Sequence, residues 1–491
     1  MTGSVLKRLL GVAVLLASSI GTTVGAAELR QAVLVQNSGW MEPFYVDAES
    51  PFKPLVAQLA QAAAGQGEVV VGAFNQSDAT HPSPEWVYRG PGNHPGLGQA
   101  MTRLQMARKG SGALADTDFK EALLGAIEVG LEGRPGIIWI VTNNKNSPNN
   151  STEVVARNRE FYELLHGEDV ISRIVAFPLK MPVQGQHYRA NGLMLYALAY
   201  GEPASAALDA VLAKPALTAL LPEGHVRLKP LTEAAVRFSP TGVTDSPGIA
   251  AGLAADGHTL VLSFDASTQV RTAQVQGRFE NLFNPYRIVS ADTSLVTPPA
   301  IGLRGEMSTH SLQALDPGKQ SDPLTLRLSL PPLPSQWSRE VLLRSGYERR
   351  GAIDIHLNNQ QLEVSPQFRA HMADLFPGDA LPEVFLPPVT ANASVTRVPL
   401  LLRVQYPMWP AVVVYGGGLL ALIGALLFLV LVTGARKATV WIDDQPQHLR
   451  LKPFTTTDVR DANGTHVATV RRGALKPRVS WAQPDTSIRI N

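Results

Sequence analysis

The hydrophobic positions of this chain change their spacing several times, and each change marks a segment of a different kind. Between residues 28 and 222, short continuous apolar runs alternate with longer stretches in which apolar residues recur at helical spacing. Continuous runs are typical of buried strands, and the longer stretches are typical of amphipathic helices. This alternation predicts an α/β domain with a doubly wound, Rossmann-like sheet and helices on both faces.

The elements of this predicted domain can be assigned one by one. Strands are expected at 32–35, 69–74, 137–141, 174–177 and 193–200. Helices are expected at 52–64, 96–107, 118–131, 153–166 and 204–221. The alanines of the last strand also allow a helix, and Pro215 is expected to break the last helix. Thr117 and Thr152 are placed to cap the third and fourth helices.

Residues 223–407 alternate apolar and polar side chains in short runs that are separated by Gly, Pro, Asn and Asp. A period of two is typical of strands with one buried face. The region is therefore predicted to form a β-sandwich of one or two modules. Proline-rich connectors are expected at 331–334 and 387–388, and a helix is expected within 367–375.

A continuous apolar stretch without a charged residue follows at 411–433. At a rise of about 1.5 Å per residue it is long enough to cross a hydrocarbon core of about 30 Å. Aromatic residues precede this predicted transmembrane helix, and Arg436 and Lys437 follow it, which marks its second end as cytoplasmic. We therefore expect a single-pass protein of the inner cell membrane, with residues 28–410 periplasmic and residues 434–491 cytoplasmic.

Residues 1–27 have the three parts of a secretory signal peptide: the cations Lys7 and Arg8, an apolar run, and small residues that end at Ala27. An uncleaved N-terminal anchor is the alternative. Both interpretations place the segment that follows outside the cytoplasm, and we predict a signal peptide because the apolar run is short.

Residues 438–491 alternate again, and Asn463-Gly464 is a hairpin signal between two of the runs. They are predicted to form a small cytoplasmic β module rather than a disordered tail. From residue 435 to 491, ten Lys and Arg minus five Asp leave a net charge of +5. This excess suits the anionic inner leaflet or an acidic partner, and a merely solvated surface is the alternative.

Composition narrows the classes of function. The hydrophobic fraction of 45% and charged fraction of 17% describe folded domains, and a net charge of +2 does not suggest a nucleic-acid partner. Because the chain has no cysteine, disulfides, thiolate nucleophiles and Cys-ligated metals are excluded. The chain is predicted not to be an enzyme, although Glu280, Asp354 and His356 leave open a hydrolase of envelope polymers, without a spacing that singles them out.

Three polar stretches are expected at one edge of the first domain. Residues 36–40 follow the first strand, 116–123 open a helix, and 140–144 end the third strand. The carboxyl ends of parallel strands form the crevice in which open α/β sheets bind ligands. Together the stretches resemble the von Willebrand factor type A family, whose metal-ion-dependent adhesion site uses an Asp-x-Ser-x-Ser turn, a Thr before a helix and an Asp after a strand. The resemblance covers about residues 29–221.

Five residues stand at the positions of that adhesion site. Ser38 and Thr117 agree with the family, Gln36 and Asn143 replace its two Asp residues, and Trp40 replaces its second Ser. The amides offer oxygen without charge, whereas Mg²⁺ prefers charged oxygen ligands in octahedral geometry. We therefore predict a degenerate site with no metal cofactor.

Mg²⁺ binding is the alternative if a nearby carboxylate restores the charge. Asp118, Asp116 and Asp47 are the candidates. Asp118 follows the retained Thr directly, but a carboxylate at the start of a helix also has a favourable role as an N-terminal charge.

A purely structural role for these residues also stays open. Gln36 and Asn143 can pair their amides across neighbouring strands simply to satisfy buried polar groups. Trp40 is either an interface anchor at the ligand edge or a residue of the core.

The resemblance implies protein–protein interaction at the cell envelope. The chain is predicted to be a membrane-anchored scaffold that binds another envelope or membrane protein, and not nucleic acid. A metal-dependent adhesion or assembly factor and a single-pass signalling receptor are the alternative functions.

Overall fold

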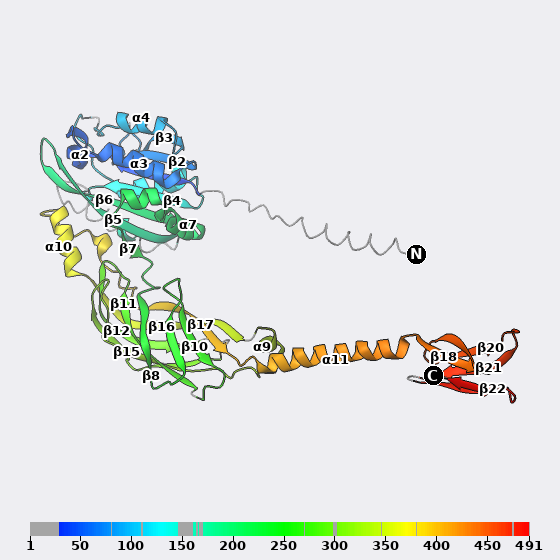
Figure 1. The fold of residues 1–491 in the computed structure, drawn as a ribbon. Helices are drawn as coiled ribbons and strands as arrows, with labels where there is room; N and C mark the ends of the chain where they lie inside the picture. Colours follow the sequence, from blue (N-terminus) through cyan, green and yellow to red (C-terminus); the bar gives the residue numbers. More distant parts are fainter. Residues whose placement is uncertain are drawn as a thin grey trace. The chain divides into compact units, whose positions relative to one another are not determined.

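The computed structural model describes residues 29–145, 161–165 and 170–490, apart from short gaps at 80, 110, 164, 270, 298–301, 345, 380 and 474–475. The protein is multidomain and rich in β-structure, with several separate sheets and one long apolar helix (Figure 1). The predicted signal peptide at 1–27, and most of the predicted helix at 153–166 with Thr152, lie outside the described residues.

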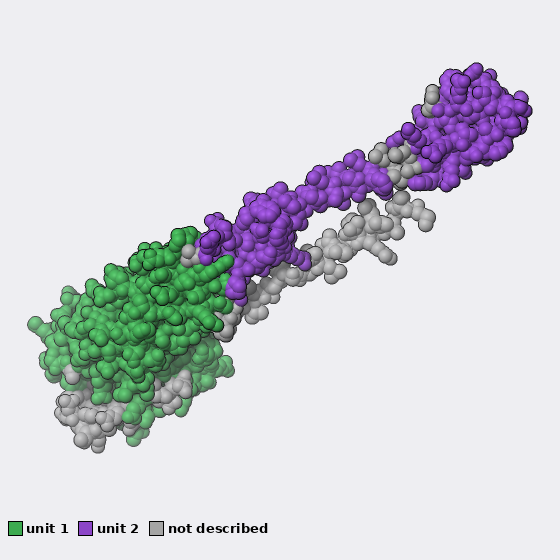
Figure 2. Space-filling model, turned by 90° about the horizontal axis from the view of Figure 1, so that it is seen from below, with its two compact units in different colours: residues 1–262, 270–331, 350–401 green, residues 263–269, 332–349, 402–491 purple. Residues whose placement is uncertain are grey.

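The chain forms two compact units (Figure 2). The first comprises Met1–Leu262, Val270–Pro331 and Arg350–Leu401, and the second comprises Ser263–Gln269, Pro332–Arg349 and Leu402–Asn491. Each unit is described by itself below.

A seven-stranded sheet organises residues 29–229, which we call the N-terminal domain. Its strands, in the order β3-β2-β1-β4-β6-β5-β7, are β3 (Glu85–Pro91), β2 (Glu68–Phe74), β1 (Gln31–Gln36), β4 (Gly136–Thr142), β6 (Arg189–Tyr200), β5 (Ile171–Gln184) and β7 (Val226–Lys229). β1 is parallel to both of its neighbours, β2 and β4. The central strands β1 and β4 are buried along their whole length, as their continuous apolar sequences predict.

The remaining strand pairs of this sheet are antiparallel. Residues 193–200 form a strand and not a helix, and they pair with β5 as a hairpin. Only residues 185–188 join β5 to β6, and a parallel crossover needs a dozen residues or more, so an antiparallel pairing follows. β3, which is largely exposed, was not predicted, and β7 extends the sheet past the expected boundary at 222.

Helices lie on both faces of the sheet. One face carries α3 (Phe52–Ala64), α4 (Gly96–Arg103), α7 (Glu202–Leu212) and α8 (Pro215–Leu220). The other carries α5 (Phe119–Gly125), the π-helical turn η2 (Ala126–Gly130) and α10 (Pro366–Leu375). The break that Pro215 predicts is confirmed, because α7 ends before it and α8 begins with it. The helix expected within 367–375 is also confirmed as α10, although it packs on β5 and β6 of the N-terminal domain.

Two further sheets occupy most of the region predicted as a β-sandwich. One has the order β14-β12-β16-β17-β10-β9, and the other has the order β13-β15-β11-β8. Their strands are β8 (Val236–Thr244), β9 (Ile249–Leu253), β10 (Leu260–Asp265), β11 (Thr272–Asn281), β12 (Tyr286–Val296), β13 (Arg304–Met307), β14 (Ser311–Leu315), β15 (Leu324–Ser329), β16 (Gly346–Val364) and β17 (Ser394–Gln405). Burial alternates residue by residue along β17, as expected for strands with one face in a core.

The second unit contains the long apolar helix α11 (Trp409–Thr433), preceded by the short helix α9 (Arg339–Arg344). The part of α11 from Trp409 to Leu429 is long and apolar enough to cross a membrane. The most apolar stretch of this part is not buried inside the protein. Between Val412 and Leu429 nearly all residues of α11 are exposed, with Leu420 at 71% and Phe428 at 67%. A helix that is apolar all round and contacts the other described elements mainly near its start suits a lipid environment.

After α11 the chain forms a small β module with a core of its own. Its two three-stranded sheets comprise β18 (Arg436–Ile442), β19 (Gln445–Leu451), β23 (Ile488–Ile490), and β20 (Thr456–Arg460), β21 (His466–Arg472), β22 (Pro477–Ala482). The hairpin signal at Asn463-Gly464 is confirmed: these residues turn the chain between β20 and β21, and Gly464 has a φ of +82°.

Candidate functional site

The structure brings the five predicted site residues together at one edge of the N-terminal domain. Gln36 ends β1, Ser38 follows it, and Trp40 lies in the 3-10 turn η1 (Gly39–Met41). Thr117 precedes α5, and Asn143 directly follows β4. Because β1 and β4 are parallel neighbours, their carboxyl ends deliver residues from distant positions to the same place.

The side-chain amide of Gln36 occupies the centre of this site. Its Nε2 donates hydrogen bonds to Ser38 Oγ at 2.8 Å, Thr117 Oγ1 at 2.9 Å and the backbone oxygen of Lys145 at 3.0 Å. Its Oε1 accepts a hydrogen bond from the Thr142 hydroxyl. Gln36 and Ser38 are wholly buried, and Thr117 is 2% exposed, so the network is closed to solvent.

This network does not fit a divalent cation. The oxygens of Ser38, Thr117 and Lys145 converge on one point, as ligands of an ion would, but the point is taken by the Gln36 nitrogen. An amide N–H satisfies such oxygens without a net charge, whereas Mg²⁺ needs compensating carboxylates and its own space. The Gln36 amide therefore links these three oxygens through neutral hydrogen bonds.

The three candidate carboxylates are engaged elsewhere. Asp118 Oδ1 accepts from the backbone N–H of Glu121 at 2.9 Å, so Asp118 is the N-cap of α5. The expectation that Thr117 caps this helix is wrong, because its hydroxyl serves the Gln36 network instead. Asp116 pairs with Lys109, and Asp47 accepts from the backbone of the β5–β6 hairpin.

Asn143 does not pair with the amide of Gln36, so the pairing across strands that the sequence left open as an alternative is not formed. Its Nδ2 donates to the backbone oxygen of Trp40 and to Tyr188 Oη, the latter at 3.0 Å. Its Oδ1 accepts from the backbone N–H of Lys145 at 3.1 Å. The Gln36 amide thus joins Ser38, Thr117 and Lys145, whereas the Asn143 amide joins Trp40 to Tyr188.

Trp40 is neither a core residue nor freely exposed. The ring is half-buried and meets Tyr188 edge to face, with ring centroids 5.7 Å apart and an interplanar angle of 70°. The hydroxyl of Tyr188 donates to the Trp40 backbone oxygen, and burial raises the pKa of Tyr188, so this donor stays protonated at neutral pH. Tyr188 therefore fixes Trp40 in two ways, through a hydrogen bond to its backbone oxygen and through contact with its indole ring.

Lys145 completes the surface around the indole, which we call the Trp40 rim (Trp40, Lys145 and Tyr188). Its ammonium lies 5.4 Å from the Trp40 ring centroid and 5.5 Å from that of Tyr188, within the range of cation–π attraction. It also pairs with Asp379 at 3.0 Å. Sequence analysis missed Tyr188 and Lys145; Lys145 directly follows the third motif stretch, but no local signal singles out Tyr188.

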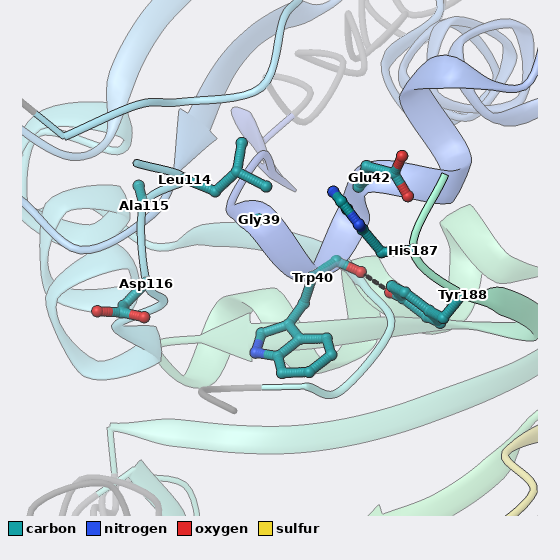
Figure 3. Close-up of a pocket in the computed structure, with 8 residues that line it drawn as sticks. All are labelled: Gly39, Trp40, Glu42, Leu114, Ala115, Asp116, His187 and Tyr188. Carbon is teal, nitrogen blue, oxygen red and sulfur yellow. Dashed lines mark hydrogen bonds between the residues drawn. The ribbon is translucent and has the colours of Figure 1, made fainter. Parts of the chain in front are cut away.

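A cavity of about 220 Å³ adjoins the Trp40 rim (Figure 3). It is lined by Gly39, Trp40, Glu42, Leu114, Ala115, Asp116, His187 and Tyr188. Figure 3 shows residues 114–116 on one side, the β5–β6 hairpin residues on the other, and Trp40 between them. A side chain at Gly39 would place its Cβ 2.6 Å from Leu114 Cβ. Glycine at this position therefore allows the backbone of the η1 turn to lie close to Leu114.

The carboxylates considered for hydrolysis lie apart from this edge and are neutralised. Glu280 pairs with Arg237 at 2.9 Å, and Asp354 forms two hydrogen bonds to Arg397, at 2.9 and 3.1 Å. The Arg397 guanidinium holds the pKa of Asp354 below its usual range. A lowered pKa does not suit Asp354 to act as a general acid, which needs a raised one.

Comparison with known proteins identifies no family for this chain. No family model matches it, and no curated protein matches it. Among solved structures it aligns with the pilus adhesin SpaC from Lactobacillus rhamnosus GG in an open conformation, over 95% of this chain and 84% of that one, with 8% identity and a TM-score of 0.16. A likeness this weak carries no argument about fold or function.

Proposed function

We propose that this protein is a membrane-anchored scaffold of the cell envelope whose N-terminal domain, similar to a type A domain, binds another envelope or membrane protein without a metal ion. The observation that carries the proposal is the Gln36 network. It holds the loops at the carboxyl edge of β1 and β4 in one arrangement through neutral hydrogen bonds. The binding edge is then preformed, which reduces the cost of ordering it when a partner docks.

The Trp40 rim supplies the contact surface in this proposal. Aromatic side chains anchor interfaces because they bury a large area with few rotatable bonds. Trp40 is half-buried and held by Tyr188, beside a cavity of about 220 Å³ that offers space for a partner side chain. The ammonium of Lys145 adds a positive charge next to the indole, and it is available to an acidic partner group if Asp379 is displaced.

Membrane anchoring completes the proposal. α11 crosses the inner membrane once, the N-terminal domain lies in the periplasm and the small β module lies in the cytoplasm. This topology is supported by the exposed apolar surface of α11 and by Arg436 and Lys437 just after its end.

Trp40→Ala should weaken partner binding by about 2 kcal/mol or more, roughly 30-fold, because an anchor residue loses its whole contact area. The loss of folding stability should stay near 1 kcal/mol, since the ring packs mainly against Tyr188. The partner is first identified by a photo-crosslinking residue at His187 in the full chain, and its affinity for the parent and the variant is then measured with purified proteins.

Trp337→Ala is the matched control, because Trp337 is 46% exposed and lies outside the N-terminal domain. It should leave the affinity unchanged. A partner that is released by a chelator would contradict the metal-free proposal, and equal loss of affinity in both variants would contradict the role of the Trp40 rim.

A further inference from the structure

The charges of the small β module are separated toward its two ends. β18 and β19 pair Arg436 with Leu451 and Ile442 with Gln445, so the start of β18 and the end of β19 lie together. In the other sheet the start of β20, the end of β21 and the start of β22 lie together, since Thr456 and Arg478 are both opposite Arg471. Each sheet therefore has one defined end at which cations collect.

Buried Arg472 joins these two ends and places them next to α11. Its Nη1 donates to the backbone oxygens of Gly434 and Leu451, both at 2.7 Å. Gly434 directly follows α11, and the backbone N–H of Phe454 donates to the Arg472 oxygen at 2.9 Å. The end of the module that Arg472 organises is thus the helix-proximal end.

Seven exposed cations lie at the helix-proximal end: Arg436, Lys437, Arg450, Lys452, Arg471, Lys476 and Arg478. Four of the five Asp residues of the module lie in the turns at its opposite end: Asp443, Asp444, Asp461 and Asp485. The fifth, Asp458, is opposite Thr469 in the middle of a strand. Two further exposed cations, Arg460 and Arg489, lie toward the opposite end, so the charges there sum to −2 against +7 at the helix-proximal end, and this asymmetry indicates a directed surface.

An exposed aromatic ring stands among these cations. Phe454 is 63% exposed and has a φ of +59°, an unfavourable backbone conformation for a residue with a large side chain. Aromatic residues at the level of lipid headgroups bury their rings among the acyl chains, while neighbouring cations contact phosphates. Phe454, with Lys452 and Arg471 nearby, provides this combination of an aromatic ring and cations.

We propose that the helix-proximal end of the module docks on the anionic phospholipid headgroups of the leaflet in which α11 ends, with Phe454 inserted between the lipids. Only Gly434 and Ala435 separate α11 from β18, and two residues span at most about 7 Å. The cations therefore lie within roughly one Debye length of the membrane surface, where attraction to anionic lipid is strong. The docking requires that α11 crosses a membrane, but it does not depend on the function of the Trp40 rim.

The test places the full-length protein in nanodiscs of phosphatidylcholine alone or mixed with phosphatidylglycerol. Backbone hydrogen exchange is measured for residues 452–456 and 471–473. Phosphatidylglycerol should slow exchange in these segments, and no protein partner is present to cause it. Equal exchange in both lipids would overturn the proposal and leave an acidic protein as the partner of this surface.

A charge-reversed pair tests the surface residues. Lys452→Glu with Arg471→Glu should reduce the docking equilibrium constant by roughly 30-fold or more, because each Lys or Arg near an anionic leaflet contributes about 1 kcal/mol and each new carboxylate is also repelled. Arg460→Glu with Arg489→Glu makes the same change in net charge toward the opposite end and should keep the protection. Equal loss of protection in the two double variants would contradict docking by the helix-proximal end.

Salt provides a second measurement that needs no substitution. Raising the ionic strength from about 0.1 M to about 1 M shortens the Debye length from roughly 10 Å to roughly 3 Å. The protection by phosphatidylglycerol should then fall toward its value in phosphatidylcholine. Protection that persists unchanged at high salt would overturn an electrostatic origin.

Discussion

The double variant Gln36→Asp with Asn143→Asp should be stabilised by Mg²⁺, by about 2.7 kcal/mol at a metal concentration one hundred times the dissociation constant. The parent should show no stabilisation at the same concentration. Without metal the double variant should be less stable than the parent by roughly 3–5 kcal/mol, because it buries unpaired carboxylates and leaves buried hydroxyls without their donor.

The reason lies in the geometry of the Gln36 network. Gln36 Nε2 donates to three oxygens within 3.0 Å, and aspartate both removes this nitrogen and shortens the side chain. The oxygens of Ser38, Thr117 and Lys145 and the carboxylate at position 36 would then border the vacated point, and the carboxylate at position 143 would add negative charge from the neighbouring loop. Oxygen ligands with negative charge are what Mg²⁺ prefers.

The measurement is differential scanning calorimetry of the full-length protein with Mg²⁺ and with a chelator. Gln36→Leu is the matched control, since it removes the same hydrogen bonds without adding a charge and should be destabilised without responding to metal. An equal Mg²⁺ response in the parent and the double variant would show that the native site already binds an ion.

Trp139→Ala should destabilise the N-terminal domain by roughly 3–5 kcal/mol, a large part of the 5–15 kcal/mol that is typical of a folded domain. Trp139 lies in the middle of β4 with no exposed surface, and its Nε1–H donates to Gln31 Oε1 at 2.8 Å. Alanine would leave a cavity between the sheet and the helices of one face. It would also leave the amide oxygen of Gln31 buried without a donor.

A graded series separates these two contributions. Trp139→Phe keeps most of the apolar contact but loses the hydrogen bond, so its cost should be about 1–3 kcal/mol. Trp40→Ala, the same substitution as Trp139→Ala at a half-buried position, should cost near 1 kcal/mol. Calorimetric unfolding of the three variants checks the order, and equal costs at Trp40 and Trp139 would show that Trp40 belongs to the core.

A binding edge closed by an amide has a functional consequence in the proposed scaffold. A site that depends on an ion gains and loses its arrangement with metal concentration, whereas the hydrogen bonds of Gln36 and Asn143 are always present. Partner binding at the Trp40 rim should then be constitutive.

Local sequence was sufficient where one strand or helix buries its own apolar residues. The run at 32–35 became the central strand β1, Pro215 separated α7 from α8, and the stretch at 411–433 became the exposed apolar helix α11. The apolar pattern of single strands was insufficient to predict how those strands pair. Residues 174–177 and 193–200 each indicated a strand, but their antiparallel pairing followed from the short loop between them.

The residue pattern alone predicted the succession of the described segments, the long apolar helix and a turn with amides at positions 36 and 143, where a type A adhesion site would carry carboxylates. These follow from side-chain type and spacing, which need no knowledge of distant contacts. Contacts between distant residues were needed to show that the nitrogen of Gln36 takes the centre of the site and that Tyr188 supports Trp40. The physical reason is that the direction of a hydrogen bond depends on which side chains the folded strands and loops bring within about 3 Å of each other, from positions that are far apart in the chain.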